Sequence, residues 1–179
     1  MILAAAPVWS LALLGLLLLA AAAQDAATLK ISNLTNAAIL LLGIVTILVM
    51  GPRLAVWQNV AVFAALLTLG TALFAAGKLG GGDVKLLAAG GLWFPVSEGL
   101  QMLLAVALAG GGLALLILIA RSFRQSDRES RIPFLNRGAP IPYGVAIAIG
   151  MVFAIVMQRG EQEKMPDPLA VPSLSSLAS

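Results

Sequence analysis

The sequence predicts an all-α integral membrane protein built as a bundle of about six transmembrane helices. Of its 179 residues, 60% are hydrophobic and only 11% are charged, and the mean hydropathy is +1.01. A soluble domain usually carries about 25% charged residues, so this chain has too few charges to cover a water-soluble globule. The apolar residues also gather into runs separated by short polar segments. A run of about 20 apolar residues is long enough to cross a bilayer as a helix.

The predicted spans follow the apolar runs in chain order. These runs are residues 2–23, 36–50, 54–77, 84–96, 99–120 and 141–157. The fourth run is short, because it gives about 20 Å of helix against about 30 Å of hydrocarbon. We expect residues 1–157 to form the membrane domain and residues 158–179 to form a polar, flexible C-terminal tail. The first run has no basic segment before it and exceeds the usual core of a secretory signal, which favours a span over a cleaved signal peptide.

The basic residues sort onto one side of the predicted bundle. Six spans place both termini on the same side of the membrane and the loops at 24–35, 78–85 and 121–140 on the other. These loops hold Lys30, Lys78, Lys85, Arg121, Arg124, Arg128, Arg131 and Arg137, whereas the opposite side holds Arg53, Arg159 and Lys164. Cytoplasmic loops are enriched in Lys and Arg, so we expect these loops in the cytoplasm and both termini outside. This topology accounts for the net charge of +3, and the bilayer, not nucleic acid, is the expected partner.

The composition excludes several kinds of chemistry. The chain has no cysteine and no histidine. Disulfides, thiolate or histidine metal sites, cysteine nucleophiles and Ser-His-Asp catalysis are therefore excluded. We expect no metal and no cofactor. Any catalysis must use carboxylates, lysines, hydroxyls or backbone groups.

Two aspartates lie where a membrane protein rarely places a charge. Ionisable residues at membrane depth are costly and indicate a functional site. Asp25 follows the first span and Asp83 opens the fourth, so the topology brings both to the same membrane face. Because the fourth run is too short for the hydrocarbon, either the bilayer thins locally or Asp83 and its glycines are drawn below the surface, where such backbone is tolerated only beside a protein cavity or water. The alternative is that Asp83 simply caps a helix and Asp25 ends a span.

Two close carboxylates are expected to share one proton, so that one activates water and the other polarises a carbonyl. A helix N-terminus favours negative charge and a C-terminus disfavours it. Asp83 opens a helix and Asp25 ends one, so we expect Asp83 ionised and Asp25 protonated. The glycines beside Asp83 are expected to adopt unusual backbone angles and to present backbone groups to an extended peptide.

Three segments together resemble a known family. Residues 80–86, Gly-Gly-Gly-Asp-Val-Lys-Leu, resemble the Gly-x-Gly-Asp signature of prepilin peptidases. Residues 25–33 resemble their first motif, an Asp followed by a basic residue and Ile-Pro-Asn, with Ser32 in place of Pro. Residues 142–146 resemble the Pro-Tyr-Gly start of the last span in the short members from tight-adherence (Flp) pilus systems. The order and spacing of these segments agree over residues 1–157.

The resemblance implies a membrane-embedded aspartyl endopeptidase of the bacterial inner membrane. Such an enzyme removes the short basic leader of prepilins or pseudopilins at the cytoplasmic face, and the pilus assembly machinery is a possible partner. Asp25 and Asp83 would be the catalytic pair. Residues expected at the substrate pocket are Gly80, Gly82, Asn33, Pro142, Tyr143 and Gly144. Asn33 could instead cap the second helix. Larger relatives that also methylate the new N-terminus carry a cysteine-rich insertion, so methyltransferase activity is not expected here.

Two other readings stay open at this point. Presenilin-like enzymes use the same Gly-x-Gly-Asp chemistry to cut inside transmembrane helices. A non-enzymatic carrier or pilus-assembly protein could also hold paired acids in a bundle. A carrier is expected to show related halves with paired broken helices, whereas this chain has one broken region and no visible repeat.

Overall fold

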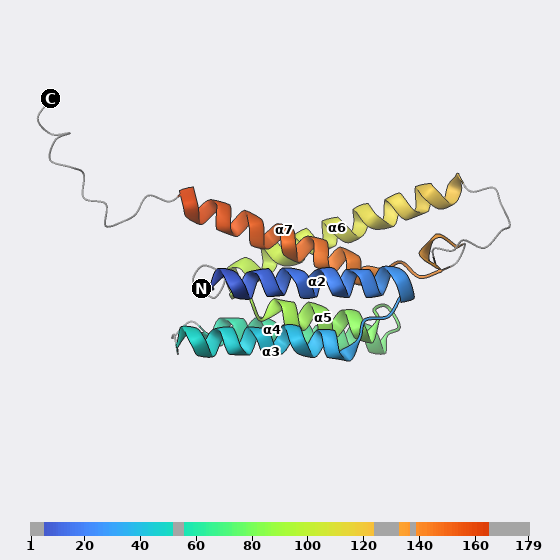
Figure 1. Ribbon diagram of the computed structural model, residues 1–179. Coiled ribbons are helices and arrows are strands. Elements are labelled where there is room, and N and C mark those ends of the chain that lie inside the picture. Colours follow the sequence, from blue (N-terminus) through green and yellow to red (C-terminus); the bar gives the residue numbers. More distant parts are fainter. Residues whose placement is uncertain (1–5, 52–55, 124–132, 137–138, 165–179) are drawn as a thin grey trace, which may run out of the picture.

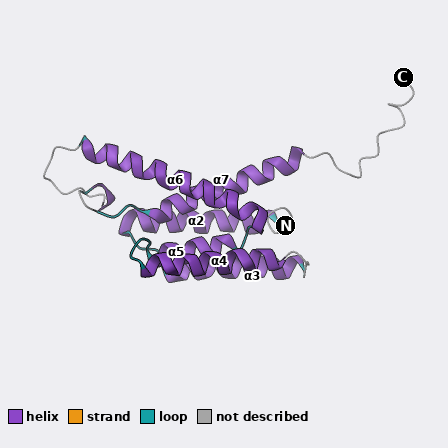
Figure 2. Ribbon diagram, turned by 180° about the vertical axis from the view of Figure 1, so that it is seen from behind, coloured by secondary structure: helices purple, strands orange, loops and turns teal. Residues whose placement is uncertain are grey.

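The computed structural model describes residues 6–51, 56–123, 133–136 and 139–164 (Figure 1). Within these ranges all regular structure is helical, as the sequence predicts (Figure 2). The α-helices are α2 (Val8–Thr28), α3 (Asn33–Met50), α4 (Val56–Ala75), α5 (Gly81–Gly91), α6 (Val96–Ser122) and α7 (Tyr143–Lys164), with a 3-10 turn, η1 (Pro133–Leu135), before α7. Five of them, all except α5, are long and apolar enough to cross a membrane.

The short helix α5 forms the centre of the bundle. It packs against α3, α4 and α7, and its buried residues continue into Leu92, Trp93 and Phe94, which are at most 4% exposed. A helix that is shielded by longer neighbours has little contact with lipid, so it need not match the thickness of the bilayer. The fourth apolar run is therefore an internal helix packed among α3, α4 and α7.

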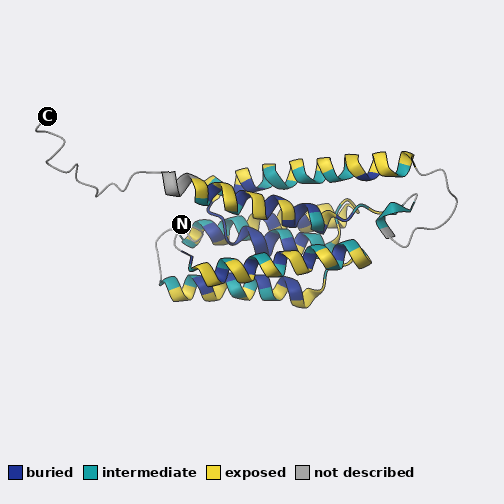
Figure 3. Cartoon of the chain, turned by 45° about the horizontal axis from the view of Figure 1, so that its top comes forward, coloured by how far each residue is buried: buried dark blue, intermediate teal, exposed yellow. Residues whose placement is uncertain are grey.

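The long helices carry many exposed large apolar side chains, and Figure 3 shows exposed positions along their outer surfaces. Leu108 on α6 is 76% exposed, and Leu48 on α3 is 73% exposed. Monomeric soluble proteins rarely expose contiguous apolar surface of this extent, because its contact with water is unfavourable. The exposed leucines therefore mark the lipid-facing surface of a multi-pass membrane protein.

Several boundaries differ from the sequence prediction for local reasons. The helix α3 begins at Asn33 because the Ser32 hydroxyl accepts the backbone N–H of Leu34 at 3.1 Å and caps the helix. The helix α7 continues past residue 157 to Lys164, so part of the predicted tail is helical. The rest of that tail, like most of the basic segment at 121–137, lies outside the described residues.

One end of the bundle collects the segments that the predicted topology assigns to the cytoplasm. The ends of α2, α4 and α6 and the starts of α3, α5 and α7 all lie at the right-hand end in Figure 1. The helices α6 and α7 cross closely, since a Cβ added at Gly150 would lie 2.5 Å from Val106 Cα. This crossing directs the start of α7 under α6 and toward the end of α2.

Candidate active site

Asp25 lies in the last turns of α2 and is only 4% exposed. Its Oδ2 accepts the backbone N–H of Gly144 at 2.6 Å and that of Val145 at 3.3 Å. Both amides belong to the first turn of α7 and have no acceptor in the preceding turn, as at every helix N-terminus. Asp25 therefore supplies the acceptor that α7 needs, and α7 holds the carboxylate in one orientation.

Gly144 is required by the closeness of this contact. A Cβ at position 144 would lie 2.9 Å from Asp25 Oδ2 and 2.5 Å from Ile31 Cδ1. Real Cβ atoms essentially never approach other heavy atoms to less than 3.0 Å. A side chain at this position would push α7 away from Asp25.

Asp83 lies in the first turn of α5, where the helix dipole favours negative charge. Gly80 precedes the helix with extended backbone angles, φ −73° and ψ 144°. The sequence expectation of left-handed backbone at residues 80–82 is wrong, because Gly81 and Gly82 are helical and the positive φ of 69° falls on Gly77. Glycine at position 80 instead leaves room for the Asp83 carboxylate, because a Cβ there would lie 2.7 Å from Asp83 Oδ2.

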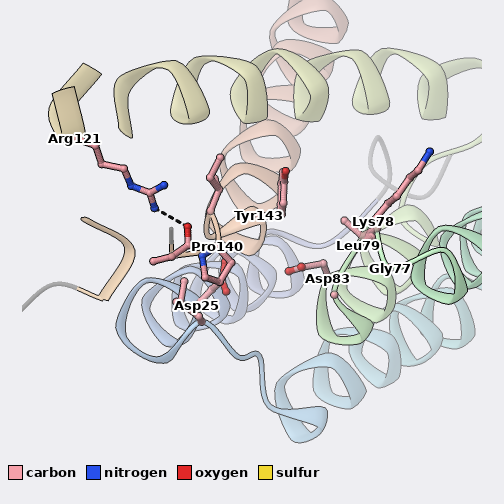
Figure 4. A pocket seen from close by; sticks show the side chains of 12 residues that line it. Asp25, Gly77, Lys78, Leu79, Asp83, Arg121, Pro140 and Tyr143 are labelled. Atoms are coloured by element: carbon pink, nitrogen blue, oxygen red, sulfur yellow. Dashed lines mark hydrogen bonds between the residues drawn. The ribbon is translucent and has the colours of Figure 1, made fainter. Parts of the chain in front are cut away.

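The two aspartates line the same two cavities. The larger has a volume of about 580 Å³ (Figure 4), and the smaller has a volume of about 270 Å³. The larger is lined by Asp25, Leu29, Gly77, Lys78, Leu79, Gly80, Asp83, Arg121, Ala139, Pro140, Ile141 and Tyr143. The smaller is lined by Asp25, Leu29, Lys30, Ile31, Gly80, Gly81, Gly82 and Asp83. In Figure 4 the Asp83 carboxylate points from α5 toward the Asp25 side of the cavity. Both carboxylates therefore border both hollows.

The surroundings of Asp83 favour its protonated form. Burial, and to a lesser extent the nearby charge of Asp25, raise the pKa of Asp83 to about 6, while a hydrogen bond from the Gly80 backbone acts in the opposite direction. The helix α5 that carries Asp83 is not one of the five spanning helices. A carboxyl with such a pKa can hold a proton near neutral pH and release it readily.

The sequence argument for a charge difference between the two aspartates lacked one contact. The sequence placed Asp25 only at the C-terminal end of a helix, where negative charge is disfavoured. The fold adds the N-terminus of α7 on the other side, and its two amides stabilise a negative charge on Asp25. Both aspartates therefore face a helix N-terminus, and the sequence could not reveal the one that is supplied by long-range packing.

The remaining sequence-predicted residues divide into two groups. Tyr143 lines the larger cavity, and Gly82 lines the smaller one. Pro142 is buried but does not line either cavity. Asn33 also lies outside both cavities. It does not cap α3, and its Oδ1 instead accepts the Lys85 ammonium at 2.8 Å.

The sequence reasoning missed Arg121, which it assigned to topology. The guanidinium of Arg121 donates to the Phe134 carbonyl at 2.6 Å and to the Ala139 carbonyl at 2.8 Å. Figure 4 shows this side chain reaching across to the segment that carries Pro140. Arg121 thus fastens the end of α6 to the segment that leads into α7. Lys78 also lines the cavity, but Figure 4 shows its ammonium pointing away from the carboxylates.

Comparison with known proteins gives one match. Residues 12–115, more than half of the chain, match the type IV leader peptidase family. The matched range contains Asp25 and Asp83 and stops before the start of α7. No curated protein and no solved structure matches the chain.

Proposed function

The chain belongs to the type IV leader peptidase family, and we propose that it is an aspartyl endopeptidase whose catalytic pair is Asp25 and Asp83. The observation that carries this proposal is the shared cavity. Two carboxylates from α2 and α5 line the same two hollows, in a chain with no histidine and no cysteine to offer another nucleophile or base. Membership in a peptidase family supplies the reaction class, and the paired carboxylates supply a way to perform it.

In the proposed mechanism the two carboxyl groups share one proton. The ionised member removes a proton from a water molecule, which attacks the scissile carbonyl while the protonated member polarises the carbonyl oxygen. When the tetrahedral intermediate collapses, the carbon–nitrogen bond breaks and the leaving nitrogen takes up a proton from the pair. No covalent intermediate is needed.

We assign the ionised role to Asp25 and the proton to Asp83. The two α7 amides stabilise negative charge on Asp25, whereas the raised pKa of Asp83 keeps a proton within reach. Carbon-13 NMR of labelled aspartates, assigned with the two Asp→Asn variants, tests this order. The assignment requires Asp25 to ionise first as the pH rises, and the opposite order would return the base role to Asp83.

The substrate class in this proposal is a prepilin or pseudopilin with a short basic leader. The sorting of basic residues supports a cytoplasmic location for the end of the bundle that holds the aspartates, and the proposed leader would be removed on that side. The Pro-Tyr-Gly start of α7 resembles the short enzymes of tight-adherence pili, and Gly144 of that motif contacts Asp25. The membrane in this proposal is the bacterial inner membrane.

A co-expression assay tests the proposed function. A prepilin is expressed with the wild type, Asp25→Asn or Asp83→Asn, and leader removal is followed by gel shift and mass spectrometry. Loss of either carboxylate is expected to lower cleavage by at least about 10³-fold, because no other group in the chain replaces the missing acid or base. Glu98→Gln is the matched control, since it makes the same change at the first turn of α6, at the other end of the bundle.

The outcomes separate the remaining readings. Robust cleavage by Asp25→Asn or Asp83→Asn, at wild-type protein levels, would refute the two-aspartate mechanism. Cleavage within a generic transmembrane helix, with the prepilin left intact, would favour a presenilin-like enzyme. A wild type that cleaves neither substrate would favour a non-enzymatic role.

A further inference from the structure

The segment at residues 31–36, made of the end of the α2–α3 connection and the first turn of α3, contacts both helices that carry the proposed catalytic aspartates. We propose that Gln24 and Asn36 are positioning residues that set the separation of Asp25 and Asp83 through this segment. The inference builds on the proposed function, but the geometry that it concerns can be measured without any cleavage.

On the α2 side, the link runs through Gln24, the neighbour of Asp25. Its Oε1 accepts the backbone N–H of Ser32 at 2.9 Å, and its Nε2 donates to Thr35 Oγ1 at 2.9 Å. Thr35 is buried, with 7% exposure. One side-chain amide therefore holds the end of α2 to the first turn of α3 at two points.

On the α5 side, the link runs through Asn36, the residue that follows Thr35. Its Nδ2 donates to the carbonyl of Gly82 at 3.1 Å, and the side chain is only 4% exposed. Gly82 directly precedes Asp83 and packs closely on Ile31, because a Cβ at Gly82 would lie 3.3 Å from Ile31 Cβ. This contact fixes the start of α5 relative to α3.

The two links meet in one rigid turn. Thr35 and Asn36 are consecutive residues in the first turn of α3, so a displacement of either catalytic helix is transmitted to the other through that turn. A polar side chain buried at membrane depth is energetically costly, so its presence at Asn36 indicates a role in the protein. The exposed hydrogen bond between Lys85 and Asn33 joins α5 and α3 as well, but water competes for it, so it is expected to matter less.

Ser32 makes the α2 link unusually testable. Gln24 uses the backbone N–H of Ser32, which proline cannot supply. The φ of Ser32 is −64°, a value that proline adopts without strain. Ser32→Pro therefore removes the hydroxyl cap and one of the two points of the Gln24 link, leaving its bond to Thr35, whereas Ser32→Ala removes the cap alone and keeps both points.

The separation of the aspartates can be measured with thiol crosslinkers. The chain has no cysteine, so Asp25→Cys with Asp83→Cys creates a single reactive pair. A graded series of bifunctional thiol reagents is applied in native membranes, with and without Gln24→Leu or Asn36→Leu. We expect the shortest effective reagents to lose yield by at least about threefold in both backgrounds. Asn59→Leu is the matched control, because Asn59 is equally buried, at 2% exposure, and lies at the far end of α4.

Kinetics on enzymes that retain both aspartates give the second readout. Misplacing a reacting group by about 1 Å can lower the rate by about 100-fold. Gln24→Leu, Asn36→Leu and Ser32→Pro are expected to lower kcat by about 10- to 100-fold with little change in KM, while Ser32→Ala keeps a kcat close to that of the wild type. A general loss of folding would instead lower the amount of active enzyme in proportion to the amount of protein inserted.

An unchanged crosslinking profile together with unchanged kcat in Gln24→Leu and Asn36→Leu would overturn the proposal. If Asn36→Leu fails to insert into the membrane, the test uses the two substitutions at exposed Ser32 instead. Equal crosslinking yields for Ser32→Pro and Ser32→Ala would then count against the proposal. Failure of the wild type to cleave a prepilin would overturn the proposed function but leave the crosslinking result to stand.

Discussion

The two aspartates line one cavity but depend on different parts of the chain. Asp83 lies in the first turn of α5, and the residue that shapes its surroundings, Gly80, is three positions away. Asp25 depends on amide donors that lie 119 and 120 residues further along the chain, in α7. The close steric contact of the Asp83 carboxylate is therefore local, whereas the donors to the Asp25 carboxylate are brought in by tertiary packing. Changes at the start of α7 should consequently have larger effects than changes in the glycine segment before α5.

Among changes that keep both carboxylates, Gly144→Ala is expected to produce the largest effect. The added Cβ would contact both Asp25 and Ile31, and Asp25 is too buried to move aside, so α7 must shift and its amides must leave the carboxylate. We expect kcat for leader cleavage to fall by about 100-fold, measured with purified enzyme and a prepilin substrate.

Gly160→Ala is the control for this change. It makes the same substitution in the same helix, at a position where a Cβ would meet nothing within 4 Å. Wild-type kcat in Gly144→Ala would mean that the α7 amides do not hold Asp25 during catalysis.

Gly80→Ala is expected to have a smaller effect on kcat. Its Cβ would lie 2.7 Å from Asp83 Oδ2, but this oxygen is the end of a side chain that is partly exposed to the cavity. The carboxylate can rotate away, so we expect kcat to fall by about 10-fold. Gly112→Ala on α6 is the control, because a Cβ there meets nothing within 4 Å. A larger loss in Gly80→Ala than in Gly144→Ala would reverse the proposed difference between the two aspartates.

The same division between local and long-range structure decides what the sequence could predict. The helical class, the lipid-facing runs and the position of Asp83 at a helix start all follow from local composition and spacing, and the structure agrees. Ser32 as the cap of α3 was also within reach of the sequence, since serine is a preferred N-cap. The choice of Asn33 as a possible cap was wrong because the helix begins at Asn33 itself.

The contacts made by Asp25, Arg121 and Asn36 could not be predicted from the sequence. Each joins elements that are distant in the chain: Asp25 to α7, Arg121 to the segment before α7, and Asn36 to the start of α5. An arginine at the end of a span satisfies the positive-inside pattern whether or not it also binds carbonyls. Only the packing of the helices reveals which polar side chains serve the site.

Arg121→Lys tests how firmly the start of α7 must be held. Arginine donates to the Phe134 and Ala139 carbonyls through a planar fork, whereas lysine keeps the charge but lacks that geometry. The wall of the larger cavity should loosen, and we expect KM to rise by about three- to tenfold with a smaller change in kcat. Arg159→Lys is the control, because Arg159 donates to the Ala6 carbonyl at the opposite end of the bundle. Unchanged kinetics would show that α7 keeps its position without this support.

The smallest expected effect concerns stability and the raised pKa of Asp83. This pKa is about 6 in the folded protein against an ordinary value of 3.8, so the folded state binds more protons than the unfolded state between these values, and stability falls as the pH rises through this window. Asp83→Asn removes the buried charge. Its Tm in detergent, followed by tryptophan fluorescence, should match that of the wild type near pH 4 and exceed it by a few degrees at pH 7.5. If the Tm difference between Asp83→Asn and the wild type is the same at both pH values, the surroundings of Asp83 do not destabilise its ionised carboxylate. The site would then hold two readily ionised aspartates.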